Sequence, residues 1–244
     1  MKKSIKKSLV SFLIFAMCLS NATLSAGAFS SDTHEYTTKR GSIIVEETFG
    51  SELASFYNAE VKAQLKIYCT KPDEDEAQGS YKVHFYNPAT EKNFIGEDDS
   101  ALSRFTDHYN QAVDLYKKGR KNEAFEQLAR SVHFLEDMNT PVHTNNQSFL
   151  DSAIDVLLHV TFEKKCVKLQ SRVESIMLKR EFDYYKNNTI KQIGKSSAFL
   201  ANDNFYAMYQ KIETQERIAL NSIENAQKAV AGVFYRFYLD VRGI

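Results

Sequence analysis

The chain has 244 residues, and its 31 lysines and arginines are balanced by 31 aspartates and glutamates. That length suffices for one compact domain with a buried core. The balanced charge offers no basic stripe of the kind that proteins binding nucleic acid carry, so we expect no nucleic-acid partner.

The N-terminal residues 1–28 have the three parts of a secretory signal peptide. Lysines precede a short apolar stretch at residues 9–19, and small residues at 26–28 form a cleavage site. The apolar stretch is shorter than the roughly 20 residues that a membrane span needs. We therefore predict a secreted protein whose single domain covers residues 29–244 and begins at Phe29. Removing the four lysines of the signal, which has no acids, leaves 27 basic and 31 acidic side chains.

Two cysteines, Cys69 and Cys166, remain after the predicted signal. An exported protein can oxidise such a pair to a disulfide. Spacing alone does not assign one, so the pairing stays open at this point.

Beyond residue 70 the chain alternates between one loop-like segment and several helical ones. Residues 71–99 are acidic and contain two prolines and two glycines, which predicts a long loop of the kind that is often functional. Later segments have apolar residues at helical spacing, and Gly119 is a good helix C-cap. The predicted helices cover residues 101–118, 121–138, much of 151–180 and about 202–241.

The segment HFLEDMNTPVH, from His133 to His143, combines histidines with an aspartate at a helix end. His133 and Asp137 are four residues apart, which places their Cβ atoms about 5–6 Å apart on one helix face. Pro141 ends the helix, because the residue before a proline is pushed out of helical geometry. The resulting turn would bring His143 back toward that face. We expect Glu136 to point to another face.

A second pair with the same spacing is His159 and Glu163. Neutral imidazole nitrogen and carboxylate oxygen are donors that zinc accepts. One such pair also arises as an ordinary surface ion pair, whereas two pairs and His143 together indicate a metal site. The chain lacks the H-E-x-x-H motif of the common zinc proteases.

Several dispersed segments resemble, in order, those of the zinc-dependent bacterial phospholipases C, the secreted phosphatidylcholine-hydrolysing enzymes that include the catalytic domain of clostridial alpha-toxin. The segments are THEYTTKRGSIIVEE, KPDED, HFYNPATEKNF, HFLEDMNTPVH, DSA with HVTFE, and NSIENAQKAVAGVFYRFYLDV. The resemblance covers almost the whole chain after the predicted signal. It implies an all-α fold, a single compact multi-helix domain of the zinc phospholipase C and P1 nuclease type.

The resemblance further implies three zinc ions, held by histidines, carboxylates and the mature N-terminus. The ligands implied for the first ion are Asp73, His84, His133 and Asp137. Those implied for the second ion are His143, His159 and Glu163. Those implied for the third ion are the amino nitrogen and carbonyl oxygen of Phe29, together with His34 and a shared Asp137.

The family's N-terminal tryptophan is absent, because the chain contains no tryptophan and Phe29 takes that place. The ligating atoms would be backbone atoms, so the exchange alters packing rather than donors. The resemblance implies Asp73 as general base or water-orienting residue, with Asp75 as the alternative. His108, the remaining histidine, is interpreted as an ordinary helix residue.

The implied function is hydrolysis of the glycerol–phosphate ester of phospholipids such as phosphatidylcholine, by a monomer at membrane surfaces. The products would be diacylglycerol and a phosphorylated head group. A secreted zinc nuclease of the same fold superfamily and a non-catalytic zinc-binding relative remain as alternatives. The sequence does not determine the head-group preference.

Overall fold

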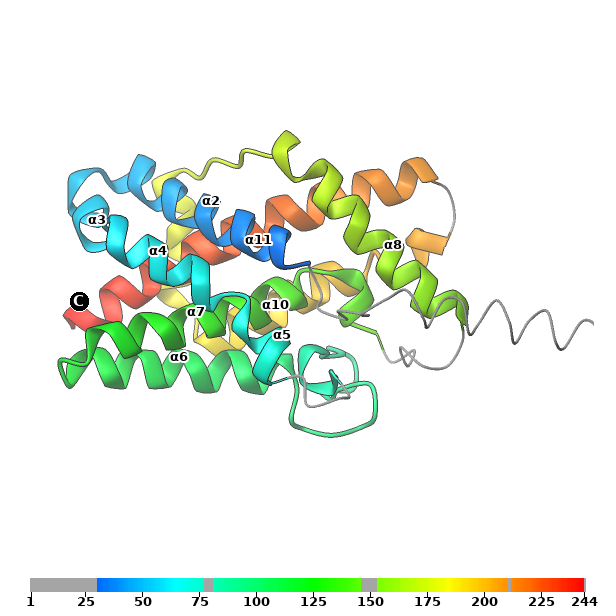
Figure 1. Ribbon diagram of the computed structural model, residues 1–244, viewed down its shortest axis with the longest axis horizontal. Helices are drawn as coiled ribbons and strands as arrows, with labels where there is room; N and C mark the ends of the chain where they lie inside the picture. The colour runs from blue at the N-terminus through cyan, green and yellow to red at the C-terminus, as the bar shows by residue number, and fades with distance from the viewer. Residues whose placement is uncertain (1–29, 77–80, 146–152, 210–211, 244) are drawn as a thin grey trace, which may run out of the picture.

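Helices make up nearly all the regular structure of the protein (Figure 1). The computed structural model describes residues 30–76, 81–145, 153–209 and 212–243. The longer helices are α2 (Ser31–Phe49), α4 (Ala59–Tyr68), α6 (Ala101–Lys117), α7 (Lys121–Met138), α8 (Ala153–Leu169), α10 (Ile190–Asn202) and α11 (Ile212–Arg242). The short segments are α3 (Ser51–Phe56), α5 (Lys71–Asp75), η1 (Lys82–His84), η2 (Pro141–His143), η3 (Gln170–Arg172), η4 (Lys179–Glu181), α9 (Phe182–Asn187) and η5 (Tyr206–Tyr209). The described residues contain an isolated β-bridge but no strand, so the expected all-α fold is confirmed.

Helices α6 and α7 form an antiparallel pair, as their sequence pattern predicts (Figure 1). Gly119 follows α6 with a φ of 81°, a left-handed conformation that glycine adopts without a Cβ clash. Because α7 starts two residues later, the chain reverses and the two helices pack along their length. This pairing buries the apolar face of α7 and carries its C-terminal end into the interior.

Helix α2 lies against α11, which has 31 residues and is about 46 Å long (Figure 1). Their close approach depends on Gly41, because a Cβ atom there would lie 2.5 Å from Cγ1 of Val230. This packing places the first turns of α2, and with them His34, beside the buried end of α7.

Two expectations about local structure were wrong. Residues 71–99 are not one continuous loop, because α5 forms at their start and η1 in the middle. The last helix begins at Ile212 rather than near residue 202, since a separate helix, α10, occupies residues 190–202. The helix predicted over much of residues 151–180 is α8, which ends at Leu169. Helix α10 has its own start signal in Thr189, whose side chain accepts a hydrogen bond from the Gln192 amide.

Cys69 and Cys166 are separate buried thiols, so the disulfide that the sequence left open does not form. Each belongs to a different cluster of apolar core side chains. Within the described ranges, no helix is both long and apolar enough to span a bilayer. The predicted signal, residues 1–28, and Phe29 lie outside the described residues.

Candidate metal centre

The C-terminal end of α7 carries three ionisable side chains without exposed surface: His133, Glu136 and Asp137. Removing carboxylates from water costs several kcal/mol for each ion unless partners compensate. The partners of these three side chains therefore define the site.

The first group joins α7 to the segment around α5 and η1. His84 Nδ1 lies 2.9 Å from Asp137 Oδ2 and 3.1 Å from His133 Nε2. Asp73 Oδ1 lies 3.6 Å from His133 Nε2 and 3.8 Å from His84 Nδ1. The structure thus brings together all four side chains that the resemblance assigns to one metal ion.

The second group joins α7 to α2. His34 Nε2 lies 3.6 Å from Asp137 Oδ1, and the rings of His34 and His133 stack with centroids 4.0 Å apart. Asp137 therefore turns one carboxylate oxygen toward His34 and the other toward His84. A ligand shared between two metal ions requires this orientation.

The third group joins η2 to α8. His143 Nε2 lies 3.0 Å from His159 Nε2, which lies 2.7 Å from Glu163 Oε1. The backbone carbonyl of His84 accepts a hydrogen bond from His143 Nδ1 at 2.8 Å, and this bond ties the third group to the first. The turn after α7 therefore returns His143 to the site, as the sequence led us to expect.

Hydrogen bonds from outside each group orient the histidine rings. His133 Nδ1 donates to the carbonyl of Cys69 at 2.7 Å, and His34 Nδ1 lies 2.5 Å from Glu136 Oε2. In each ring, Nε2 then faces a carboxylate of the site, that of Asp73 for His133 and that of Asp137 for His34. Histidines that bind metals typically use one nitrogen for the ion and the other for such a bond.

Burial controls the charge state of the centre. It lowers the pKa of His133 to about 4, although Asp137 opposes the shift, and it holds the pKa of His34 well below its usual range. The same desolvation raises the pKa of Asp137 well above its ordinary value and that of Asp73 to about 6. The imidazoles of His133 and His34 are therefore neutral with available lone pairs. The carboxylates of Asp137 and Asp73 need a cation to stay ionised.

Buried polar atoms without partners show where a cation fits. Among the described residues, both carboxylate oxygens of Asp73 and Oδ1 of Asp137 have no hydrogen-bond partner. Buried polar atoms are normally paired. Nitrogen and oxygen donors gathered in this way are those that zinc takes, so the residues fit zinc.

The structure also separates Asp73 from Asp75. The Asp73 side chain is 6% exposed and faces the histidines, whereas that of Asp75 is 49% exposed and pairs with Arg130. Of the two, only Asp73 lies at the centre.

Glu136 corrects an expectation, because it does not point away from the site. It is fully buried, contacts His34 and accepts a hydrogen bond from Thr38 Oγ1 at 3.0 Å. The available signal was its spacing from His133, since residues three apart also share a helix face.

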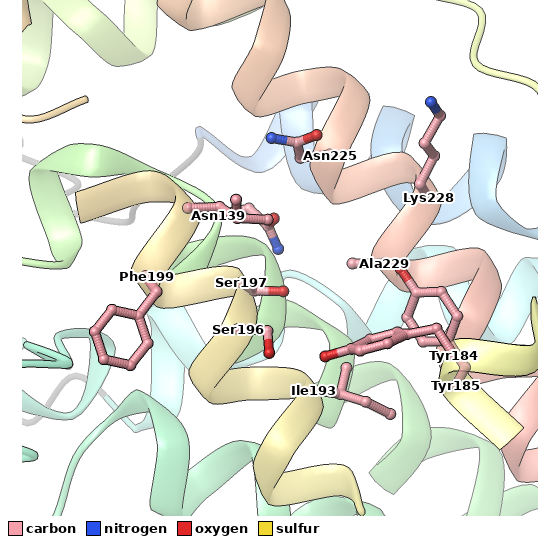
Figure 2. Close-up of a pocket in the computed structure, with 11 residues that line it drawn as sticks. Asn139, Tyr184, Tyr185, Ile193, Ser196, Ser197, Phe199, Asn225, Lys228 and Ala229 are labelled. Atoms are coloured by element: carbon pink, nitrogen blue, oxygen red, sulfur yellow. The ribbon is translucent and has the colours of Figure 1, made fainter. Parts of the chain in front are cut away.

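A pocket of about 480 Å³ opens elsewhere, between α9, α10 and α11 (Figure 2). Tyr184 and Tyr185 line one side of it, and Phe199 and Lys228 lie on the others. None of its lining residues belongs to the three groups, so this pocket is not the metal centre.

Several known proteins are similar to this chain in sequence or in fold. No family model matches the chain. Phospholipase C of Clostridium haemolyticum is 27% identical over 74% of this chain and 50% of its own length. Phospholipase C of Clostridium novyi is 25% identical over 98% of this chain and 68% of its own length. The chain thus spans between half and about two thirds of these relatives.

Solved structures show the same fold. Alpha toxin from Clostridium absonum superposes with a TM-score of 0.76 at 24% identity, covering 86% of this chain and 63% of that one. Clostridium perfringens alpha-toxin from an avian strain gives 0.74 at 23% identity with the same coverage. The chain is therefore similar in sequence to clostridial phospholipases C and in fold to clostridial alpha toxins, and the resemblance stated from its motifs is confirmed.

Proposed function

We propose that the protein is a secreted, zinc-dependent phospholipase C that hydrolyses the glycerol–phosphate ester of phospholipids such as phosphatidylcholine. The observation that carries the proposal is the meeting of three groups of buried nitrogen and oxygen donors around the end of α7. The relatives named phospholipase C support the reaction class. The acting form is proposed to be a monomer at a membrane surface.

The proposed ligands follow the three groups. Asp73, His84, His133 and Asp137 would hold the first zinc ion, and His143, His159 and Glu163 the second. His34, Asp137 and the Phe29 backbone would hold the third. Bound zinc would supply a lowered pKa for water and neutralisation of charge on the phosphoryl group.

Asp73 is proposed to orient the attacking water and take its proton on a carboxylate oxygen. Both of its oxygens are buried and have no hydrogen-bond partner within the described chain. One oxygen can therefore bind the metal ion while the other accepts a hydrogen bond from the attacking water molecule. The water oxygen forms the new bond to phosphorus, and the bond from phosphorus to the glycerol oxygen breaks. The glycerol oxygen leaves as the hydroxyl of diacylglycerol, taking up the proton that Asp73 removed from water.

Metal analysis combined with two substrates tests this function. Protein beginning at Phe29 is expected to hold three zinc ions and to release the phosphorylated head group from a phosphatidylcholine emulsion. Single-stranded DNA, assayed in parallel, should remain intact. Cleavage of DNA alone would favour a nuclease, and bound zinc without hydrolysis of any phospholipid would favour a non-catalytic relative.

The N-terminal ligand is tested separately. Before signal cleavage the Phe29 nitrogen is an amide, which is a poor donor, whereas a free α-amino group loses its proton readily when a cation replaces it. Protein with a few residues added before Phe29 should therefore hold less zinc and hydrolyse phosphatidylcholine far more slowly. Equal zinc content and turnover in both forms would exclude the N-terminus as a ligand.

A further inference from the structure

Helix α5 presents two carboxylates, Asp73 and Asp75, to two side chains of α7. Asp73 Oδ1 lies 3.6 Å from His133 Nε2. Asp75 accepts two hydrogen bonds from the guanidinium of Arg130, at 2.8 and 2.7 Å. Because Arg130 and His133 are three residues apart, they occupy one face of α7. The Asp75–Arg130 ion pair therefore forms in the same packing of α5 against α7 that places Asp73 beside His133.

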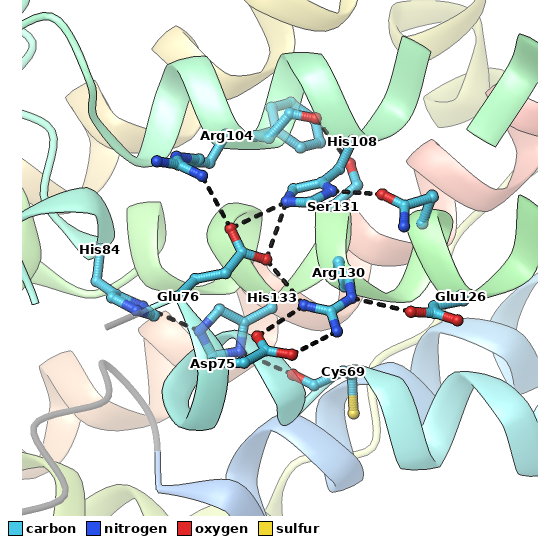
Figure 3. Close-up of polar contacts among 12 residues, drawn as sticks. Cys69, Asp75, Glu76, His84, Arg104, His108, Glu126, Arg130, Ser131 and His133 are labelled. Carbon is cyan, nitrogen blue, oxygen red and sulfur yellow. Dashed lines mark hydrogen bonds and ion pairs between the residues drawn. The ribbon is translucent and has the colours of Figure 1, made fainter. Parts of the chain in front are cut away.

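Glu76 forms a second attachment next to the first (Figure 3). Its carboxylate accepts hydrogen bonds from Arg130 at 2.9 Å and Arg104 at 3.2 Å, and His108 Nε2 lies 3.1 Å away. Burial would raise the pKa of Glu76, but the hydrogen bonds and charges of His108 and Arg130 outweigh it and lower the pKa to about 2. Glu76 therefore remains ionised. His108, which we interpreted as an ordinary helix residue, contacts this carboxylate.

The segment needs such attachments, because α5 is short and contributes little apolar surface. It is a five-residue helix with one apolar residue, Pro72. Helices this short are not stable in isolation, so tertiary contacts must hold them. Arg130 touches both Asp75 and Glu76 while its own side chain is only 12% exposed.

We propose that Arg130 is a positioning residue for the metal centre. Its hydrogen bonds to Asp75 and Glu76 fix helix α5 in place. The Asp73 carboxylate is thereby held toward His84 and His133. The inference rests on the proposed function, which makes Asp73 a zinc ligand. A planar guanidinium binds a carboxylate through two parallel hydrogen bonds, and lysine cannot reproduce that geometry.

Zinc affinity measured by chelator competition tests the proposal directly. We expect Arg130→Gln to weaken the affinity for one zinc ion by about 10- to 100-fold, the usual cost of losing an outer contact. Arg130→Lys should recover part of this loss, because it keeps the charge. The matched control is Arg120→Gln at the N-terminal end of α7, far from the centre, which removes an arginine from an exposed pair with Glu123 and should leave the affinity unchanged.

A second variant checks that the effect passes through the ion pair. Asp75→Asn should lower the affinity less than Arg130→Gln does, because Arg130 also contacts Glu76. The double variant should lose no more than Arg130→Gln alone, since that variant already lacks the contact with Asp75. In phosphatidylcholine hydrolysis, kcat should fall while KM changes less than twofold, since Arg130 would position a reacting group rather than bind lipid.

Unchanged zinc affinity in folded Arg130→Gln or Arg130→Lys protein would overturn the proposal, as would an equal loss in Arg120→Gln. Additive losses in the double variant would also overturn it. The failure of the proposed function is distinguishable. Wild-type protein that binds zinc but hydrolyses no phospholipid would refute the phospholipase assignment, while the affinity series would still decide the role of Arg130.

Discussion

Glu76 and Asp137 are both largely withdrawn from water, yet their surroundings differ in one respect. Glu76 accepts hydrogen bonds from Arg104 and Arg130, and its pKa is lowered to about 2. Asp137 faces three histidines and, within the described ranges, no lysine or arginine. Burial raises its pKa well above the ordinary value. The chain supplies its own cations at Glu76, whereas Asp137 lacks a cationic side chain within the described ranges and would be balanced by the proposed zinc ions.

The largest expected effect is that of removing zinc, because zinc removal would leave the buried Asp137 carboxylate without a cation. Zinc contributes about 10–16 kcal/mol in small zinc-dependent peptides, against about 5–15 kcal/mol for the stability of a whole domain. Chelation should abolish hydrolysis and lower the melting temperature by more than about 10 °C, since each kcal/mol shifts it by about 2–4 °C. A melting temperature unaffected by verified zinc loss would contradict this expectation.

The next effect concerns Asp137 itself. Asp137→Asn keeps the shape but removes the charge that faces both the His34 and the His84 groups. We expect the loss of at least one zinc ion and a fall in kcat of more than about 100-fold, comparable with or beyond the loss of an outer contact. Zinc counting and steady-state kinetics measure both. Retention of three zinc ions with near-normal turnover would show that Asp137 is not a shared ligand.

Glu136 should give an intermediate effect. Glu136→Gln weakens the hydrogen bond that orients His34, and outer contacts of this kind typically contribute 10- to about 100-fold in metal affinity. The control is Glu123→Gln near the exposed start of the same helix, for which a change within about 0.5 kcal/mol is expected. Chelator competition compares the two variants. Equal, small effects would mean that the buried contact with His34 does not support the metal centre.

The smallest effect concerns stability at Glu76 and depends on pH. A carboxyl whose pKa is lowered on folding stabilises the protein above its unfolded pKa, and this contribution is lost as pH falls through the folded value. Glu76→Gln should therefore cost about 1–2 kcal/mol near neutral pH, after allowance for partial screening. The difference from wild type should shrink between about pH 4.5 and pH 2. Urea unfolding of both proteins measures it, and a difference that stays constant with pH would contradict the cation partners assigned to Glu76.

Local patterns in the sequence were enough to predict much of the frame of this protein. The apolar periodicity and Gly119 predicted α6 and α7 with nearly their observed bounds, because both signals act within a few residues. The spacing of four residues placed His133 beside Asp137, and His159 beside Glu163, because the geometry of one helix determines such neighbours. The all-α fold followed from the same patterns and from the family resemblance.

Only the tertiary structure decided which carboxylates belong to the centre. Asp73 and Asp75 stand in the same acidic run, and packing of α5 against α7 turns one toward His133 and the other toward Arg130. Glu136 joined the site because α2 approaches that side of α7. These outcomes depend on contacts between residues 50 or more positions apart. Short-range periodicity carries no information about such distances, since they follow from how whole helices pack.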